Sequence, residues 1–239
     1  MGFDITFHPI TREELKTFVF DVIEKPSLAE ERALMISKDD NKQESIKNIY
    51  MRLEEFRDEL LNGECEFGES YGFAAAAIAG YIHPYWYSRQ GCISFICMEE
   101  SESQRISNKL LNNSKKTFNG LLESLVELSP DTFKEIEDEG DGLITRNYCG
   151  GGYIDNSKLS YLKELIEDPA YENLVSRIMD EDNLKALKHV INYALLHNTG
   201  ILEASDIIVP VSNECYSDFN NLRADFKNTD NDYSNSREV

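Results

Sequence analysis

Apolar residues that recur every three or four positions constrain the fold of this chain more than any other feature. In the clearest case, Ile46, Ile49, Leu53, Phe56 and Leu60 form one stripe, while the charged side chains between them fall mostly on the opposite face. Asn62-Gly63 follows, as is typical of a helix end. The same spacing recurs at residues 15–22, 121–128, 159–166, 174–179 and 184–195. These patterns predict a chain dominated by amphipathic helices.

Strand patterns are few. Residues 3–8 alternate apolar and polar side chains, which predicts a half-buried strand that Pro9 ends. Thr11 stands three residues before Glu14 in a capping box, which predicts a helix directly after this strand. Residues 92–98 fit a buried strand or a helix equally well, and residues 206–210 are a possible short strand. The glycine-rich segment at residues 148–156 is expected to be a turn.

The organisation predicted from these patterns is a single domain. The sequence contains no internal repeat and no obvious linker, and 41% of its 239 residues are apolar, which is enough for a substantial core. We expect a mostly α fold of the α+β class, a helical domain at residues 1–226 with a small sheet that includes the N-terminal strand. The polar residues 227–239 are expected to form a disordered tail.

The segment Gly68-Glu69-Ser70-Tyr71-Gly72 matches G-x-S-x-G, the nucleophile elbow of α/β-hydrolases. In that elbow a buried parallel strand delivers the serine, and His and Asp partners follow later in the chain. Candidates in the right order exist, with Ser70 as nucleophile, His189 or His197 as base, and Asp168 or Asp182 as the third group. A serine hydrolase is therefore one functional hypothesis.

The residues before Ser70 argue against an elbow. Glu64, Glu66 and Glu69 precede or adjoin the serine, and an interior strand cannot bury unpaired charges of this kind. The chain also lacks the series of Val/Ile-rich strands that an α/β-hydrolase needs. We therefore predict no catalytic residue, and expect Ser70 to cap the alanine-rich helix that follows it.

Metal and cofactor motifs are also missing from the sequence. The five cysteines form no C-x-x-C pair and their number is odd, which argues against a disulfide framework and against a zinc site. The acidic segment with Glu137, Glu139 and Asp141 superficially resembles a calcium loop, but the position of the bidentate glutamate falls on Tyr148. We expect no metal and no cofactor.

The charge balance bears on the class of partner. With 44 acidic and 24 basic residues, the chain has a formal net charge of −20. Such a surface repels nucleic acid and anionic membranes, and it attracts basic partners by long-range steering. The longest apolar run, near residues 73–82, is too short to span a bilayer, and the N-terminus resembles no signal peptide. We expect a cytoplasmic protein.

Residues 81–89 are the densest candidate binding segment. Tyr, Trp and Arg are enriched in protein interfaces because they bury a large area and keep a polar group. Such rings can equally close the core over helix ends, or line a ligand pocket. The candidates here are Tyr81, His83, Tyr85, Trp86, Tyr87 and Arg89. Acidic loops are further candidates, namely Glu137, Asp138, Glu139 and Asp141, and Asp180–Asp182.

Several stretches resemble a known class of proteins. GFDITFHPIT, the following EELKTFVFDV, AGYIHPYWYSR and GILEASDIIVP together cover about a fifth of the chain. They resemble segments of immunity proteins from bacterial polymorphic-toxin and type VI secretion systems. The resemblance implies a non-enzymatic protein that binds and blocks one cognate toxin acting in the cytoplasm. It carries over no site residues, because such families share no single binding site.

Three functional hypotheses result. The first is an immunity or inhibitor protein that occludes a basic toxin, and the second is a serine hydrolase that uses Ser70. The third is a protein-interaction domain for an unrelated partner. The first and third differ only in the partner, which the sequence does not identify.

Overall fold

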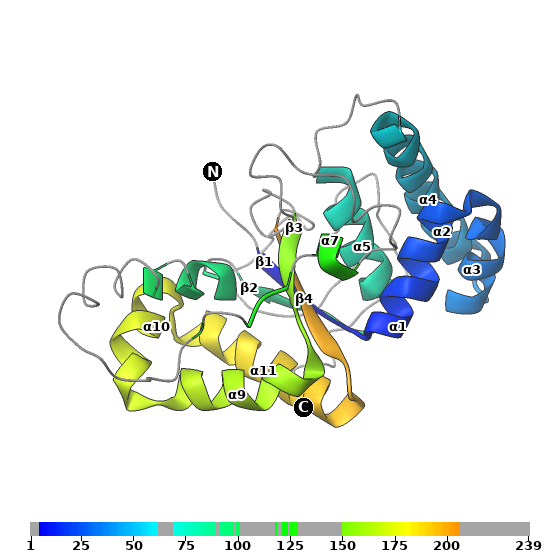
Figure 1. Cartoon of the computed structure of the whole chain (residues 1–239). Coiled ribbons are helices and arrows are strands. Elements are labelled where there is room, and N and C mark those ends of the chain that lie inside the picture. The colour runs from blue at the N-terminus through cyan, green and yellow to red at the C-terminus, as the bar shows by residue number, and fades with distance from the viewer. Residues whose placement is uncertain are drawn as a thin grey trace.

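The structure is a computed structural model that describes residues 5–61, 69–88, 91–97, 99–100, 118, 121–123, 125–128 and 150–205. Helices predominate and enclose a four-stranded antiparallel sheet with strand order β2-β1-β4-β3 (Figure 1). The strands are β1 (Ile5–Ile10), β2 (Trp86–Ser88), β3 (Gly150–Ile154) and β4 (Gly200–Ser205). This confirms the predicted mostly α fold with a small sheet that contains the N-terminal strand.

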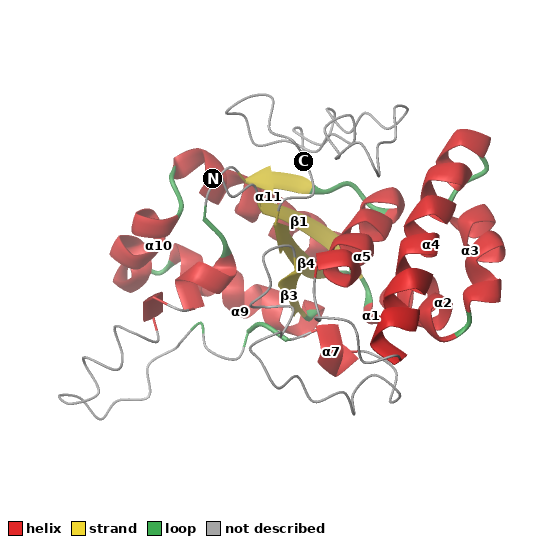
Figure 2. Cartoon of the chain, turned by 90° about the horizontal axis from the view of Figure 1, so that it is seen from above, coloured by secondary structure: helices red, strands yellow, loops and turns green. Residues whose placement is uncertain are grey.

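One helical layer comes from the N-terminal part of the chain. A π-helical turn, Lys16–Phe20, joins two short helices, and a 3-10 turn, Pro26–Leu28, leads into a pair of longer ones. Helix α5 packs directly on the sheet, and the α3–α4 pair lies outside it (Figure 2). The helices of this layer are α1 (Arg12–Leu15), α2 (Asp21–Glu24), α3 (Ala29–Ile36), α4 (Asp40–Leu61) and α5 (Glu69–Ile82).

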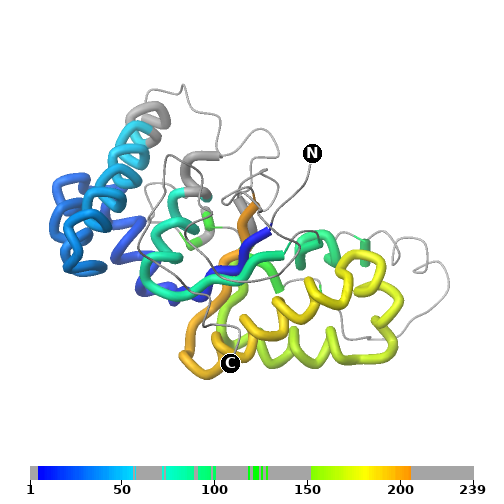
Figure 3. The backbone as a smooth tube through the Cα atoms, turned by 180° about the vertical axis from the view of Figure 1, so that it is seen from behind, coloured from blue at the N-terminus to red at the C-terminus, as the bar shows by residue number. Residues whose placement is uncertain are grey.

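The other layer comes from the C-terminal part of the chain. Helix α11 (Glu181–His197) contacts β1, β2 and β4, and it packs beside α9 (Asn156–Glu167), as Figure 3 shows. A 3-10 turn, Pro169–Tyr171, and α10 (Glu172–Ile178) connect the two. Residues 93–97 and 99–100 are also helical, and α7 (Leu125–Leu128) is a single turn. The ambiguous segment at residues 92–98 is therefore helical over residues 93–97.

The sheet divides the core into two apolar clusters. Alternate strand residues point to opposite faces, so Ile10, Tyr87 and Leu202 lie in the cluster under α5. Ile5, Trp86 and Ile201 lie in the other cluster, under α9 and α11. The fold is thus a helix–sheet–helix sandwich in which both faces of the sheet are covered.

Strand β1 differs from its predicted form. All six of its residues are buried, rather than every second one, because helices cover both faces of the sheet. Pro9 does not end the strand and pairs with Ile201 of β4. Trp86, the first residue of β2, pairs with Phe7, so among the described residues Pro9 has a paired strand on only one side, where a residue without an N–H group is tolerated.

The expected turn at residues 148–156 is wrong, since Gly150–Ile154 form strand β3. Glycine is needed here and in β4 for close packing. A Cβ atom on Gly152 would lie 2.6 Å from the Leu122 side chain, and one on Gly200 would lie 2.2 Å from the Tyr153 hydroxyl. The strand expected at residues 206–210 lies outside the described residues, and β4 instead occupies the segment directly before it.

The predicted helix boundaries are largely confirmed. Thr11 and Glu14 form the complete capping box at the start of α1, and α9 ends before Asp168-Pro169. Asp180 caps the start of α11, and Asn198, the C-cap that follows the helix, adopts a left-handed conformation at φ 56°. Helix α5 already begins at Glu69, so Ser70 is its second residue rather than its cap.

Candidate functional site

The hydrolase elbow receives no support from the described strands. All of the strand pairs are antiparallel, whereas an elbow leaves a parallel strand. Ser70 lies in the first turn of α5 on one face of the sheet, and His189 and His197 lie in α11 on the other. The residues before the serine, at positions 62–68, lie outside the described residues. The structure does not bring the three candidate catalytic residues together.

Most of the aromatic candidates are in the core. Tyr81, Tyr85, Trp86 and Tyr87 are all buried, with at most 7% of any of them exposed. Rather than facing a partner, they fill the core, which was the alternative explanation for this segment. Tyr81, Tyr85 and Tyr87 lie in the cluster under α5, and Trp86 lies in the cluster under α9 and α11. His83 is the exception, with a half-buried side chain, and Arg89 lies outside the described residues.

The structure builds a polar cluster around His83. Its Nε2 atom lies 3.0 Å from Oε1 of Glu14, and its Nδ1 atom lies 3.4 Å from the hydroxyl of Tyr193. Oε2 of Glu14 accepts hydrogen bonds from the backbone N–H and the hydroxyl of Thr11. The cluster therefore joins the start of α1, the end of α5 and the last two turns of α11.

Aromatic rings extend this cluster across α11. His197 stacks on Tyr193 with ring centroids 4.0 Å apart, and Trp86 lies 5.2 Å from Tyr193. Tyr193 is half-buried and His197 is exposed, so the stack reaches from the core to solvent. The π-helical turn Lys16–Phe20 begins two residues after Glu14, and such turns are frequent at functional sites. We take Glu14, His83, Tyr193 and His197, called the His83 cluster below, as the candidate functional site.

The electrostatics of the His83 cluster favour a charged Glu14. Burial raises the pKa of Glu14, but hydrogen bonds from His83 and Thr11 outweigh it, so the pKa lies below its ordinary value. Burial, helped by the charge of Glu14, raises the pKa of Tyr193. The site thus presents the Glu14 carboxylate beside the aromatic rings of the cluster.

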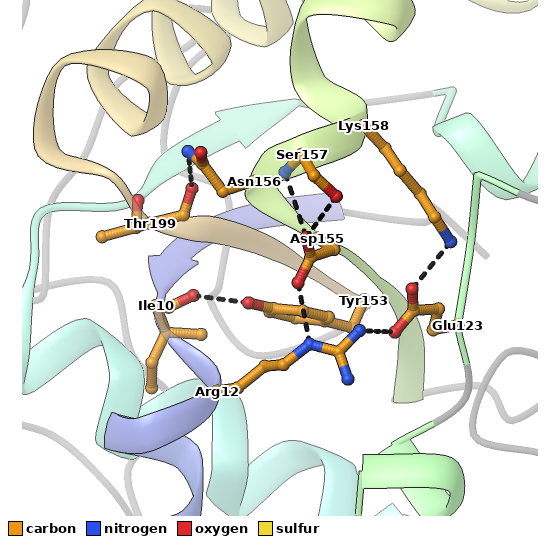
Figure 4. Close-up of polar contacts among 9 residues, drawn as sticks. All are labelled: Ile10, Arg12, Glu123, Tyr153, Asp155, Asn156, Ser157, Lys158 and Thr199. Atoms are coloured by element: carbon orange, nitrogen blue, oxygen red, sulfur yellow. Dashed lines mark hydrogen bonds and ion pairs between the residues drawn. The ribbon is translucent and has the colours of Figure 1, made fainter.

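A second polar network lies around Arg12 (Figure 4). The guanidinium of Arg12 donates to Asp155 at 2.7 Å and to Glu123, and it lies 5.9 Å from the Tyr153 ring centroid. Lys158 also pairs with Glu123, at 2.7 Å. Hydrogen bonds from Ser157 and Arg12 lower the pKa of Asp155 to about 2. Each charged group here has a partner, so the network ties α1 to α9 and β3.

The acidic candidates have local structural roles or lie outside the described residues. Asp180 accepts from the backbone N–H of Asn183 at 2.9 Å as the cap of α11, and Glu181 and Asp182 follow in its first turn, where the helix dipole favours negative charge. Glu137, Asp138, Glu139 and Asp141 lie outside the described residues.

Two buried glutamates were not predicted, Glu100 and Glu203. Glu203 of β4 is 2% exposed and accepts hydrogen bonds from the backbone N–H groups of Ile93 and Ser94 and from the Ser94 hydroxyl. Cys92 and Cys97 lie nearby, and burial raises the pKa of both thiols, that of Cys97 to about 12. Cys92 is buried and Cys97 is partly buried, in an environment that suppresses thiolate reactivity.

The comparisons give no family for this chain. No protein-family model matches it, and neither a curated protein nor a solved structure is significantly similar to it. Among the described residues, no helix is long and apolar enough to cross a membrane. The same residues contain no group of three or more His, Cys, Asp or Glu side chains placed to hold a metal ion.

Proposed function

We propose that this protein is a non-enzymatic inhibitor of the immunity-protein type, which binds a basic toxin acting in the cytoplasm and occludes the toxin's active surface. The proposal depends chiefly on the charge: 44 acidic against 24 basic residues. A surface of this kind accelerates association with a basic protein and complements the cationic cleft that a nuclease or a nucleotide-modifying enzyme needs.

The distribution of exposed carboxylates supports this proposal. They occur on both helical layers, on α3 and α4 as well as on α9, α10 and α11. Some of them form ion pairs, as Glu30 does with Lys47 and Glu31 with Arg32, but acidic residues outnumber basic ones in the chain by 44 to 24. The negative field therefore extends over much of the surface. Exposed carboxylates include Glu30, Glu31, Asp40, Glu44, Glu54, Glu55, Glu164, Glu167 and Glu172.

The structure supports binding better than hydrolysis. A serine hydrolase needs a base within hydrogen-bond reach of the serine, and the two candidate bases lie on the opposite face of the sheet from Ser70. An inhibitor that acts by occlusion needs only a folded, complementary surface. No single serine or histidine should then be indispensable, provided that the variant folds.

The proposal is tested by co-expression with the product of the adjacent gene, as the candidate toxin. We expect this product to arrest growth alone, and to be harmless when the present chain is co-expressed. Ser70→Ala should protect as well as the wild type, because Ser70 has no chemical role. The proposal would be contradicted if the wild type gave no protection against a toxic product, or if folded Ser70→Ala lost protection.

A further inference from the structure

The His83 cluster continues onto an exposed apolar side chain. Leu196 is 70% exposed, more than any other large hydrophobic residue that the structure describes. It lies three residues after Tyr193 and one before His197, so all three lie on one face of the last turns of α11. We call Glu14, His83, Tyr193, Leu196 and His197 the Tyr193 surface.

The rings of the Tyr193 surface are held in place before any partner binds. Tyr193 is stacked on His197 at 4.0 Å, tilted against buried Trp86 at 5.2 Å and linked to His83 through its hydroxyl. Side chains that are already ordered lose little conformational entropy on binding. Half-buried aromatic residues fixed in this way are typical anchors of protein interfaces.

The charge around these rings is negative. Glu14 lies beside them as a carboxylate, and α11 directs its C-terminal end, the negative end of the helix dipole, toward His197. The neighbouring cations are already paired, Arg12 with Asp155 and Glu123, and Lys16 with Asp21. An aromatic platform in a negative field fits a guanidinium or ammonium group, which would stack on the ring faces.

We infer that the Tyr193 surface is the docking site for an arginine or lysine side chain in a basic segment of the protein partner. The inference depends on the proposed function for the identity of that partner. Its claim about where on this chain the partner binds is separate. The occupant packs its aliphatic stem against Leu196 and its cationic group against the stacked rings of Tyr193 and His197.

The test compares two exposed leucines that lie in different helical layers. Leu196→Lys places a positive charge in the centre of the Tyr193 surface, and Leu34→Lys makes the same change on α3, where Leu34 is 52% exposed. Both variants change the net charge equally, and both positions tolerate a polar side chain. The dissociation constant is measured by isothermal titration calorimetry with the adjacent-gene product and with an oligoarginine peptide.

We expect Leu196→Lys to weaken binding of both ligands by about tenfold or more, and Leu34→Lys by less than about twofold. Equal effects, no effect of Leu196→Lys, or a larger effect of Leu34→Lys would each overturn the inference. If the adjacent-gene product does not bind the wild type, the proposed function fails, and the peptide still tests the surface. If it binds the wild type and Leu196→Lys equally well, the function stands and the surface is wrong.

Discussion

His8→Phe should remove much of the protein's sensitivity to mild acid. His8 is fully buried in β1, and burial lowers its pKa from 6.5 to about 3. Its Nε2 atom lies 2.8 Å from the hydroxyl of Thr6, and its ring stacks on Tyr85 at 5.0 Å. Nδ1 has no hydrogen-bond partner among the described residues. Protonation would therefore bury a charge and an N–H group without an acceptor.

The direction of the pH effect follows from comparing proton binding at His8 in the unfolded and the folded chain. Below pH 6.5 the unfolded chain binds a proton at His8 that the folded chain does not bind until about pH 3. The free energy of unfolding contributed by His8 therefore falls as the pH decreases through this window. Between pH 7 and pH 4 the loss should be about 2–3 kcal/mol.

Urea unfolding at several pH values measures this effect. Phenylalanine keeps the ring contact with Tyr85 but cannot be protonated, so His8→Phe should lose about 2–3 kcal/mol less than the wild type between pH 7 and pH 4. His197→Phe is the matched control, because it makes the same chemical change at an exposed position outside the core. Parallel curves for wild type and His8→Phe would show that His8 is not held neutral by the fold.

Glu203→Leu should destabilise the fold by about 3–5 kcal/mol. The carboxylate lies in the cluster under α11 and accepts from the backbone N–H of Ile93 at 2.7 Å and from that of Ser94 at 3.2 Å. Leucine has a similar volume but no acceptor, so these donors at the start of the helical residues 93–97 lose their partner. Glu203→Gln keeps one acceptor and should cost less.

The control for Glu203→Leu is the same change at an exposed position. Glu54→Leu, on the outer face of α4, should alter the free energy of unfolding by no more than about 0.5 kcal/mol. Hydrogen exchange adds a local measurement, because the amides of Ile93 and Ser94 should lose protection in Glu203→Leu before the rest of the sheet does. A Glu203→Leu variant as stable as the wild type would show that these hydrogen bonds contribute nothing to stability.

His8 and Glu203 have opposite effects on the pH dependence. Burial raises the pKa of Glu203, although hydrogen bonds from Ser94, Ile93 and Cys92 act against it. The folded chain therefore retains a proton that the unfolded chain releases above its ordinary pKa of 4.5, and this stabilisation is lost as the pH rises. The contribution of Glu203 is present in both the wild type and His8→Phe, so the comparison of the two isolates His8.

Local sequence patterns were sufficient to predict most of the helices, but not α3 or the helical residues 93–97. A stripe such as Ile46, Ile49 and Leu53 specifies a buried helix face whatever the rest of the chain does, and the Thr11–Glu14 capping box involves only neighbouring residues. Strands β3 and β4 gave no such signal. They contain glycines where Tyr153 and Leu122 pack closely, and a sheet that is covered on both faces loses the alternation that reveals a half-buried strand.

The candidate site could be predicted only in part, because its contacts join distant segments. Glu14 was recognised as a capping residue from its spacing to Thr11, but its other oxygen contacts His83, 69 residues away. Tyr193 lies 110 residues from His83 and resembled any other aromatic residue on an amphipathic helix. His83 and His197 were both singled out, for different functions, and nothing in the sequence indicated that both contact Tyr193.

The central claim is that this chain recognises a basic protein by its charge, and the association rate tests it most directly. We would measure the association rate constant for the wild type and the adjacent-gene product by stopped-flow fluorescence at increasing salt concentration. The account predicts a fall of about tenfold or more between low salt and several hundred millimolar, because salt screens long-range steering. A rate constant that does not change with salt would contradict it.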